Sequence, residues 1–106
     1  MVNYNKLFTL LEKKGISSYV IRQKGLLPQS TLQKFRVCSG TDKEIADKLE
    51  DYKQKNKKDF KADVSTKTIE DICQLLQCQP QDIMDWKVEL KPELSYESRF
   101  LDKSDN

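Results

Sequence analysis

The chain has 106 residues, enough for one domain of ordinary size, with 37% hydrophobic and 34% charged residues and a net charge of +2. Histidine is absent and glycine occurs three times, which excludes a histidine-activated nucleophile, a His-ligated zinc site and a glycine-rich phosphate loop. No apolar run reaches the ~18 residues that span a bilayer, and three cysteines without a secretory signal form no disulfide framework. We therefore expect a cytoplasmic binding domain that is not an enzyme, with no metal, no cofactor and no membrane partner.

Positive charge is concentrated near the N-terminus. Residues 1–36 hold seven Lys or Arg residues against one Glu, a net charge of +6. Residues 64–86 hold one Lys against four acidic residues, a net charge of −3. Such a dipole indicates a polyanion as partner, while the simpler alternative is a solubilising, lysine-rich surface.

Helical periodicity begins in residues 4–14, where apolar side chains recur at i, i+3, i+4 and i+7 and Gly15 provides the stop. Ser17 or Ser18 is placed to cap a short second helix that ends near Gly25. The first quarter of the chain is thereby predicted to form two helices.

A third helix is predicted at Gln29–Val37, because Pro28 stands at its start, a position that suits proline. Leu32 and Phe35 form its inner face, so that polar and basic side chains remain outside. Cys38 follows in a loop, where we expect the substitution Cys38→Ser to be nearly neutral.

A capping box marks the next helix, because the Thr41 hydroxyl can accept from the Glu44 amide while the Glu44 side chain reaches back. A narrow apolar seam follows, made of Ile45, Leu49 and Tyr52. Beyond it, residues 54–63 are predicted to be a fraying helix end and a linker. The lysines of this stretch form either a solvated face or a set of phosphate contacts.

Ser65 is placed to cap a helix at Thr66–Leu76, whose apolar face includes Cys73, so that Cys73→Ser is expected to destabilise the fold. Pro80 opens a last short helix, which carries Ile83, Met84 and Trp86. Of these, we expect Trp86 at the edge of the core.

From residue 87 onward the apolar residues no longer recur at helical spacing. A short strand or a docked arm is predicted from the apolar residues Val88, Leu90, Leu94 and Tyr96. Residues 101–106 are expected to be disordered.

Two segments resemble a known family. Residues 18–36, SYVIRQKGLLPQSTLQKFR, resemble the helix-turn-helix of the Cro and lambda-repressor-like (XRE) family. Residues 64–86, VSTKTIEDICQLLQCQPQDIMDW, are similar to that family's fourth and fifth helices. The small proteins of this family in Gram-positive bacteria and their mobile elements often end in a phrase similar to Cys-x-Pro-x-Asp-Ile-Met, here residues 78–84.

The resemblance implies an all-α fold, a five-helix lambda-repressor-like domain with one inserted helix. The domain would occupy residues 1–86, with the insertion at about 38–63, and residues 87–106 would form a partly disordered C-terminal arm.

Site residues follow from the family's functional positions. The polar residue that begins the second helix and touches a phosphate falls on Ser17 or Ser18. The positions that read base edges in the major groove fall on Gln29, Ser30, Thr31 and Lys34. Gln can pair with adenine N6 and N7, and Lys can donate to guanine O6 and N7. Lys24 and Arg36 would contact phosphates, which fix register without reading sequence.

Two departures from the family pattern stand out. Leu26 occupies the place where the family usually has glycine in left-handed backbone, with Gly25 one position early, which predicts a reshaped turn. About 20 extra residues also separate the third and fourth family helices, and the family core is expected to close without them, since loop entropy grows slowly with length. This insertion can add a DNA contact, add a partner surface or obstruct the groove.

The function implied is that of a sequence-specific DNA-binding transcriptional regulator, a repressor, from a bacterium, a phage or a mobile element. It would bind double-stranded DNA as a homodimer on a palindromic site. Candidate dimer or partner surfaces are Trp86 with the tail, and the seam of Ile45, Leu49 and Tyr52. The alternative is a protein-interaction module on the same scaffold, with a protein partner bound through the inserted helix. An anti-CRISPR-like inhibitor of host machinery that also represses its own promoter is one example.

Overall fold

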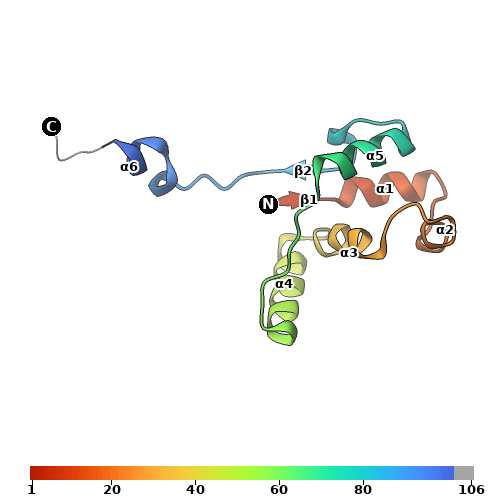
Figure 1. Cartoon of the computed structure of the whole chain (residues 1–106), viewed down its shortest axis with the longest axis horizontal. Helices are drawn as coiled ribbons and strands as arrows, with labels where there is room; N and C mark the ends of the chain where they lie inside the picture. Colours follow the sequence, from red (N-terminus) through yellow and green to blue (C-terminus); the bar gives the residue numbers. More distant parts are fainter. Residues whose placement is uncertain (102–106) are drawn as a thin grey trace.

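In the computed structural model, which describes residues 1–101, a helical body is followed by an extended arm (Figure 1). The helices are α1 (Asn5–Lys13), α2 (Ser18–Lys24), α3 (Gln29–Val37), α4 (Asp42–Asn56), α5 (Thr66–Leu76) and α6 (Tyr96–Phe100). Two 3-10 turns, η1 (Pro80–Asp82) and η2 (Pro92–Leu94), and two short strands, β1 (Val2–Asn3) and β2 (Asp85–Trp86), complete the chain. The predominance of helix confirms the all-α fold class. Within residues 1–101 no helix is both long enough and apolar enough to cross a bilayer.

The core lies between α1 and α5 on one side and α2 and α3 on the other (Figure 1). Its buried side chains are Tyr4, Leu7, Leu11, Ile21, Leu32, Phe35, Cys38, Ile69, Ile72, Leu76 and Ile83. Phe35 is fully buried, and its ring packs edge-on against the Tyr4 ring at a centroid distance of 4.6 Å. The apolar periodicity of the sequence therefore predicted the inward face of each of these helices correctly.

The predicted helix caps are present. Ser17 accepts a hydrogen bond from the Val20 amide at 3.2 Å, and Ser65 accepts one from the Thr68 amide at 3.1 Å. The bounds of α3 and α5 agree with the predicted helices because each has a cap or a proline at its start and a buried apolar stripe along its length.

The last predicted helix of the body is reduced to the single 3-10 turn η1, which is a correction to the sequence-based expectation. After it, the chain turns extended, and β2 pairs antiparallel with β1, with Val2 opposite Trp86 and Asn3 opposite Asp85. Pairing satisfies backbone groups at the N-terminus that a helix at 83–86 would leave without partners. It also leaves the Trp86 side chain 70% exposed, so the expectation of Trp86 at the core edge is wrong.

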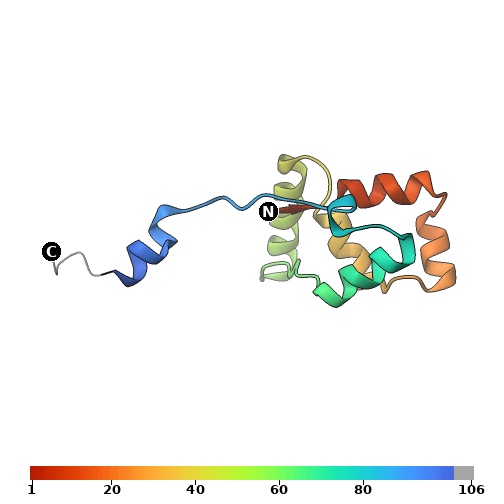
Figure 2. The ribbon, with the colours of Figure 1, turned by 90° about the horizontal axis from the view of Figure 1, so that it is seen from above.

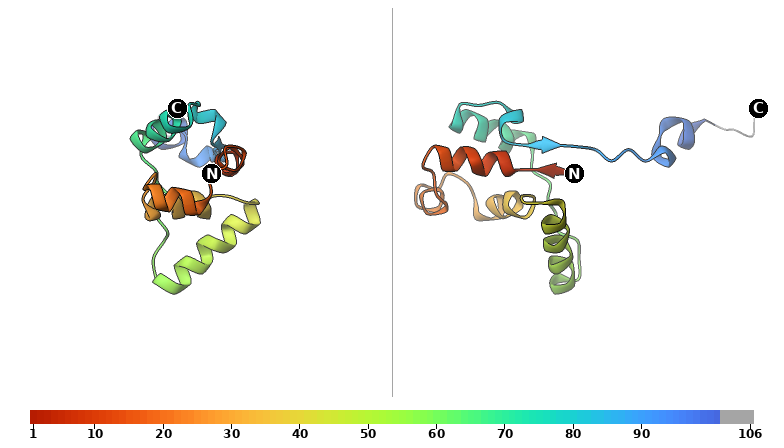
Figure 3. Two further views of the ribbon diagram at one scale, coloured as in Figure 1. Left: turned by 90° about the vertical axis from the view of Figure 1, so that its right-hand side faces the viewer. Right: turned by 180° about the vertical axis from the view of Figure 1, so that it is seen from behind.

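The C-terminal arm, residues 87–101, extends away from the body in Figure 2 and in the right panel of Figure 3. Its residues Val88, Leu90, Leu94 and Tyr96 are exposed and form neither a strand nor an arm docked on this chain's own body. The arm instead holds η2 and α6. Apart from Leu101, the segment expected to be disordered lies outside the described residues.

Cys38 is a core residue, which overturns the expectation that it lies in a permissive loop. Its side chain is 2% exposed, whereas Cys73 is half-buried. Its carbonyl, at the C-terminal end of α3, accepts a hydrogen bond from the Tyr4 amide at 2.9 Å. The reason for the burial is this contact with the N-terminal segment, which is remote in sequence.

Cys38→Ser should therefore destabilise the protein more than Cys73→Ser. A hydroxyl at the buried Cys38 position loses its solvation, with an expected cost of about 1–3 kcal/mol of unfolding free energy. The half-buried Cys73 position should cost less than about 1 kcal/mol. Urea unfolding of the two variants checks this order, and an equal or reversed ranking would contradict the placement of Cys38 in the core.

Candidate nucleic-acid interface

The turn between α2 and α3 uses Gly25 as its left-handed residue. Gly25 has φ 62° and ψ 36°, and its amide donates to the carbonyls of Ile21 and Arg22 at the end of α2. Leu26 stays outside the left-handed region and packs half-buried against the core. The left-handed residue of this turn is therefore Gly25, one position before the place where the family usually has glycine, and Leu26 avoids that conformation.

α3 presents a polar face outward while its opposite face is anchored. Leu32 and Phe35 are 1% and 0% exposed. Gln29 and Ser30 lie exposed in the first turn, and Thr31 is half-buried. Gln33, one turn after Gln29 on the same helix, is also exposed and was absent from the predicted base-contacting set. Its helical spacing from Gln29 is the signal that could have identified it.

Lys34, another predicted base-contacting residue, is half-buried and engaged within the chain. Its Nζ donates to the backbone carbonyl of Asp63 at 2.7 Å. Asp63 lies in the segment that returns from α4 to α5, so this bond ties α3 to the end of the insertion. A contact from Lys34 to a base requires its ammonium to exchange this carbonyl for the base edge.

Two of the predicted phosphate-contacting residues, one on α2 and one on α3, contact each other. The Arg36 guanidinium donates to the Ser18 hydroxyl, which joins the C-terminal part of α3 to the first residue of α2. Ser17 caps α2 with its oxygen and keeps its hydroxyl proton available for a phosphate. Lys24 lies exposed at the opposite end of α2. Two of the predicted residues thus form one cluster, and Lys24 lies apart from it.

The cations of this face are not neutralised by carboxylates. In the part of the chain that the structure describes, ion pairs join other residues, and Arg22, Lys24, Lys34 and Arg36 take part in none of them. A face of unpaired cations around exposed amide side chains has the chemistry that a nucleic-acid backbone attracts.

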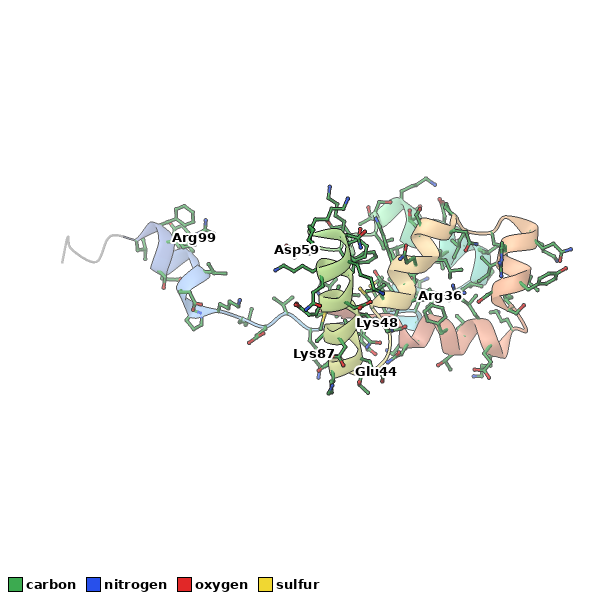
Figure 4. All side chains as sticks on the ribbon, turned by 90° about the horizontal axis from the view of Figure 1, so that it is seen from below. Arg36, Glu44, Lys48, Asp59, Lys87 and Arg99 are labelled. Carbon is green, nitrogen blue, oxygen red and sulfur yellow. The ribbon has the colours of Figure 1, made fainter. Side chains whose placement is uncertain are left out.

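The inserted helix α4 stands beside α3, on the side of α3 that faces away from α1 and α5 (Figures 1 and 3). Lys48 of α4 donates to the carbonyls of Arg36 and Ser39 at 2.8 and 2.9 Å, so it caps the C-terminal end of α3. Figure 4 shows Arg36 and Lys48 at the junction of the two helices. α4 thus borders the exposed face of α3 on one side, and we refer to it as the wall of this face.

The start of the insertion is pinned to the first turn of α1. The Gly40 amide donates to Asn5 Oδ1 at 2.7 Å, and the Gly40 carbonyl accepts from the side chains of Asn3 and Asn5 at 3.0 and 3.2 Å. The capping box of Thr41 and Glu44 follows at once and is complete. The chain is therefore held to the body at Gly40, directly before α4 begins.

The capping box also sets the charge state of Glu44. Hydrogen bonding from the Thr41 backbone, then from its side chain, lowers the pKa of the Glu44 carboxyl below its ordinary value. Because the folded-state pKa is depressed, this contribution to stability is present above the unfolded pKa of Glu44 and is lost as pH falls through the folded one. Nearby, burial raises the pKa of the Cys38 thiol, and the Lys48 ammonium opposes that rise.

The stretch 54–63 is more ordered than predicted. α4 continues to Asn56 and ends at Lys57, which takes left-handed backbone with φ 58°. The chain then returns along α4, and the Phe60 ring packs edge-on against the Tyr52 ring at 4.9 Å. The helix end at Asn56 and the irregular segment 57–63 agree with the predicted helix end and linker, whereas the contact of Phe60 with Tyr52 was not predicted.

The far end of α4 carries the lysines of the insertion. Lys53 lies 3.7 Å from Asp59, and Lys55 lies 3.1 Å from Asp51. Three further lysines are exposed and belong to none of the ion pairs of residues 1–101; they are Lys57, Lys58 and Lys61. We call these three the tip lysines.

The two candidate partner surfaces fare differently. In the seam of α4, Ile45 is 1% exposed and so is not open to a partner, while Leu49 and Tyr52 are half-buried by contacts within the chain. Trp86, in contrast, is 70% exposed and lies where the arm leaves the body. Burial thus removes Ile45 from the predicted surface and leaves Trp86 on it.

Comparison with known proteins gives one match. Residues 52–89 match a family model described as Cro/C1-type HTH DNA-binding domain. The matched segment runs from the end of α4 through α5 and η1 to just beyond β2, so it includes the family-like residues 64–86 and neither α2 nor α3. No curated protein and no solved structure matches the chain.

Ile45→Ala tests whether α4 is fixed to α3. Removing a fully buried isoleucine leaves a cavity at the junction, with an expected loss of about 2–5 kcal/mol of unfolding free energy. Ala46→Ser, at the exposed neighbouring position, should change stability by less than about 0.5 kcal/mol and is the matched control. Denaturant unfolding measures both, and equal stability of the two variants would show that α4 is not packed there.

Proposed function

We propose that the chain is a sequence-specific regulator of transcription that acts as a repressor, in keeping with the match of residues 52–89 to the Cro/C1-type HTH DNA-binding domain. The observation that carries this proposal is the face of α3, where the amide side chains of Gln29 and Gln33 are exposed opposite the buried Phe35. Lys34 and Arg36 of the same helix form no ion pair within residues 1–101. A bacterium, a phage or a mobile element is the proposed source, in keeping with the family resemblance of residues 64–86.

In this proposal α3 enters the major groove of double-stranded DNA. Gln29 and Gln33 can each donate to and accept from one adenine edge, and Ser30 can pair with several bases. Thr31 can add a methyl contact to thymine, and Lys34 can donate to guanine after leaving the Asp63 carbonyl. The buried anchors of α3 keep these side chains in one register, which favours selective readout.

Phosphate contacts would position the domain on either side of α3. The joined pair of Arg36 and Ser18 offers a cation and a hydroxyl at one spot, with the Ser17 hydroxyl one residue away. Lys24, at the other end of α2, would contact the backbone separately. These contacts supply affinity and salt dependence, and the amides of α3 supply sequence preference.

The wall formed by α4 would lie against the flank of the duplex. The first three turns of α4 carry five acidic side chains, Asp42, Glu44, Asp47, Glu50 and Asp51, which disfavour a phosphate backbone. The tip lysines lie at the opposite end and favour one. The acidic first turns and the basic tip of α4 therefore favour one of the two alternatives. They support a DNA contact made by the tip lysines, and not a helix that obstructs the major groove along its whole length.

Repression would follow from occupancy. One recognition helix reads only a few base pairs, so a useful operator needs two half-sites and two copies of the chain, with the recognition helices about one helical turn of DNA apart. A regulator held there excludes polymerase from an overlapping promoter.

Duplex binding should be strong at low salt and should weaken steeply as salt rises. Each neutralised phosphate contributes roughly 0.9 to the slope of log affinity against log salt. Replacing the three tip lysines by glutamine should reduce that slope by up to about 2.7 if all three contact phosphates. Fluorescence anisotropy with a labelled duplex at several salt concentrations measures the slope.

The control for this experiment is a pair of lysines on another side of the body. Lys13 and Lys14 border a hollow shared with Leu76 and Gln77 at the end of α5, so Lys13→Gln/Lys14→Gln should leave the slope unchanged. An unchanged slope in the tip variant removes α4 from the interface. Absence of any duplex binding at about 50 mM salt removes the regulator proposal and leaves the protein-interaction module.

Sequence preference should depend on α3 in a different way. Gln29→Ala and Gln33→Ala should each lose about 1–3 kcal/mol of discrimination between the selected site and a mutated site. Lys24→Ala should weaken both duplexes by the same factor. The site is first obtained by selection from random duplexes, and the variants are compared on it. If both Gln variants keep full discrimination, α3 is not the reading helix.

A further inference from the structure

Two of the three cysteines lie at the C-terminal end of α5, on either side of the turn that ends this helix. Gln77 takes left-handed backbone there with φ 53°, and the Cys78 amide donates to the Cys73 carbonyl at 3.0 Å. The Gln77 amide donates to the Gln74 carbonyl at 3.4 Å, which completes the two bonds of a Schellman motif. In this motif the side chains at the positions of Cys73 and Cys78 commonly contact each other. The end of α5 therefore brings two thiols together.

The pKa of Cys73 reflects this contact. Burial raises the pKa of the Cys73 thiol, and the neighbouring Cys78 thiol raises it further by charge repulsion and by a hydrogen bond between the two side chains. Asp82 adds a smaller rise of the same sign. Cys73 and Cys78 are free and half-buried, whereas Cys38 is 2% exposed in the core. Cys73 and Cys78 are thus a contacting pair of thiols that a ligand can reach.

A groove beside this pair provides space for a ligand. It has a volume of about 1040 Å³ and lies between α5 and residues 62–64, with the strand pair of β1 and β2 at its end. Both thiols line it, and its apolar lining includes Val64, Met84 and Trp86. The groove is as large as the pockets that hold small organic ligands. A ligand atom that binds both sulfurs can therefore carry an organic group in apolar surroundings.

The chemistry of the pair selects the kind of atom that it would bind. Cysteine sulfur prefers soft partners. A disulfide requires the two sulfurs to approach to about 2.05 Å, whereas a bridging atom accepts sulfurs that are merely in contact. A metal cation must displace both thiol protons, which the raised pKa of Cys73 opposes. Within residues 1–101 there is also no group of three or more Cys, Asp or Glu residues that could hold a metal ion.

We propose that Cys73 and Cys78 bind the arsenic atom of a trivalent arsenical with one organic substituent, and that this substituent lies in the groove. Two As–S bonds form and two As–O bonds of the hydrated arsenical break. Each thiol proton leaves with one of these oxygens as water, so arsenic stays trivalent and no oxidant or reductant is needed. The reaction starts from two protonated thiols, which is the state that a raised pKa favours.

This site is separate from the candidate nucleic-acid interface. None of the residues that line the groove belongs to α2, α3 or α4. The proposal therefore does not rest on DNA binding, and its tests are made without DNA.

The first test uses phenylarsine oxide as the probe. Native mass spectrometry counts the groups bound, and competition with dithiothreitol, a small dithiol, measures the affinity. Wild-type protein should bind one phenylarsenic group. Cys73→Ser and Cys78→Ser should each raise the dissociation constant at least ~100-fold, because the second As–S bond of the wild type forms intramolecularly. The double variant Cys73→Ser/Cys78→Ser, which keeps Cys38, should bind none.

Gln74→Ser is the matched control, because Gln74 is exposed in the same groove and carries no thiol. It should bind phenylarsine oxide as tightly as wild type. Far-UV circular dichroism checks that each variant keeps its helices.

A second variant keeps the number of thiols in the groove and changes only their geometry. Cys73→Ser/Gln74→Cys moves one thiol by one position along α5, which turns it by about 100° around the helix axis. Gln74 lines the groove as Cys73 does, so access to the probe is preserved. This variant should bind at least ~10-fold more weakly than wild type, because the two thiols no longer meet at the end of α5.

The third test concerns the organic group. A phenyl group buries more apolar surface in the groove than a methyl group does. The ratio of the two affinities on the protein, divided by the same ratio on dithiothreitol, should therefore favour the phenylarsenical over a methylarsenical by at least ~5-fold.

Three results would overturn the proposal. Binding by either single serine variant as tight as that of wild type would show that one thiol suffices. Undiminished binding by Cys73→Ser/Gln74→Cys would show that the geometry at the end of α5 is irrelevant. Equal preference for the two arsenicals after this correction would remove the organic group from the groove.

Discussion

The packing of Phe35 against Tyr4 is the contact on which the arrangement of the chain depends. The Phe35 ring is fully buried and meets the Tyr4 ring edge-on, and the Tyr4 amide donates to the Cys38 carbonyl at the end of α3. Tyr4 thereby fixes α3 against α1 and turns its polar face outward. The same contact places residues 2 and 3 where β1 pairs with β2, which determines where the arm leaves the body. A single pair of rings thus sets the direction of α3 and the place where the arm leaves the body.

The sequence predicted those parts of the fold that depend on local signals. Helix bounds at Gln29–Val37 and Thr66–Leu76 agree with the structure because caps, proline and apolar spacing act within a few residues. The strand pair β1–β2 was missed because two-residue strands have no periodicity and join opposite ends of the body. Burial of Cys38 and the bond from Lys34 to Asp63 were missed for a related reason. Both depend on contacts between segments that lie far apart in the sequence. The outward residues of α3 were predictable because helical spacing alone assigns them.

The segment that holds α4 is attached to the body at both of its ends, which fixes its position beside the candidate interface. Gly40 is held by Asn5 at one end, and the carbonyl of Asp63 is held by Lys34 at the other. Lys48 adds a bond to the last carbonyls of α3 between them. α4 is therefore attached to α3 at several points and not joined to the body by loose linkers. Any duplex that α3 contacts meets α4 in a fixed place, so the wall restricts the angles at which DNA can approach.

Two surfaces of the molecule lie on different elements. The polar face of α3 and the tip lysines form one, and the groove between α5 and residues 62–64 forms the other. Since β2 follows η1 directly and Ile83 is fully buried, the groove is rigidly connected to the core that holds Phe35. The arm leaves the body directly after β2, so its starting point is fixed relative to α3 through the same core.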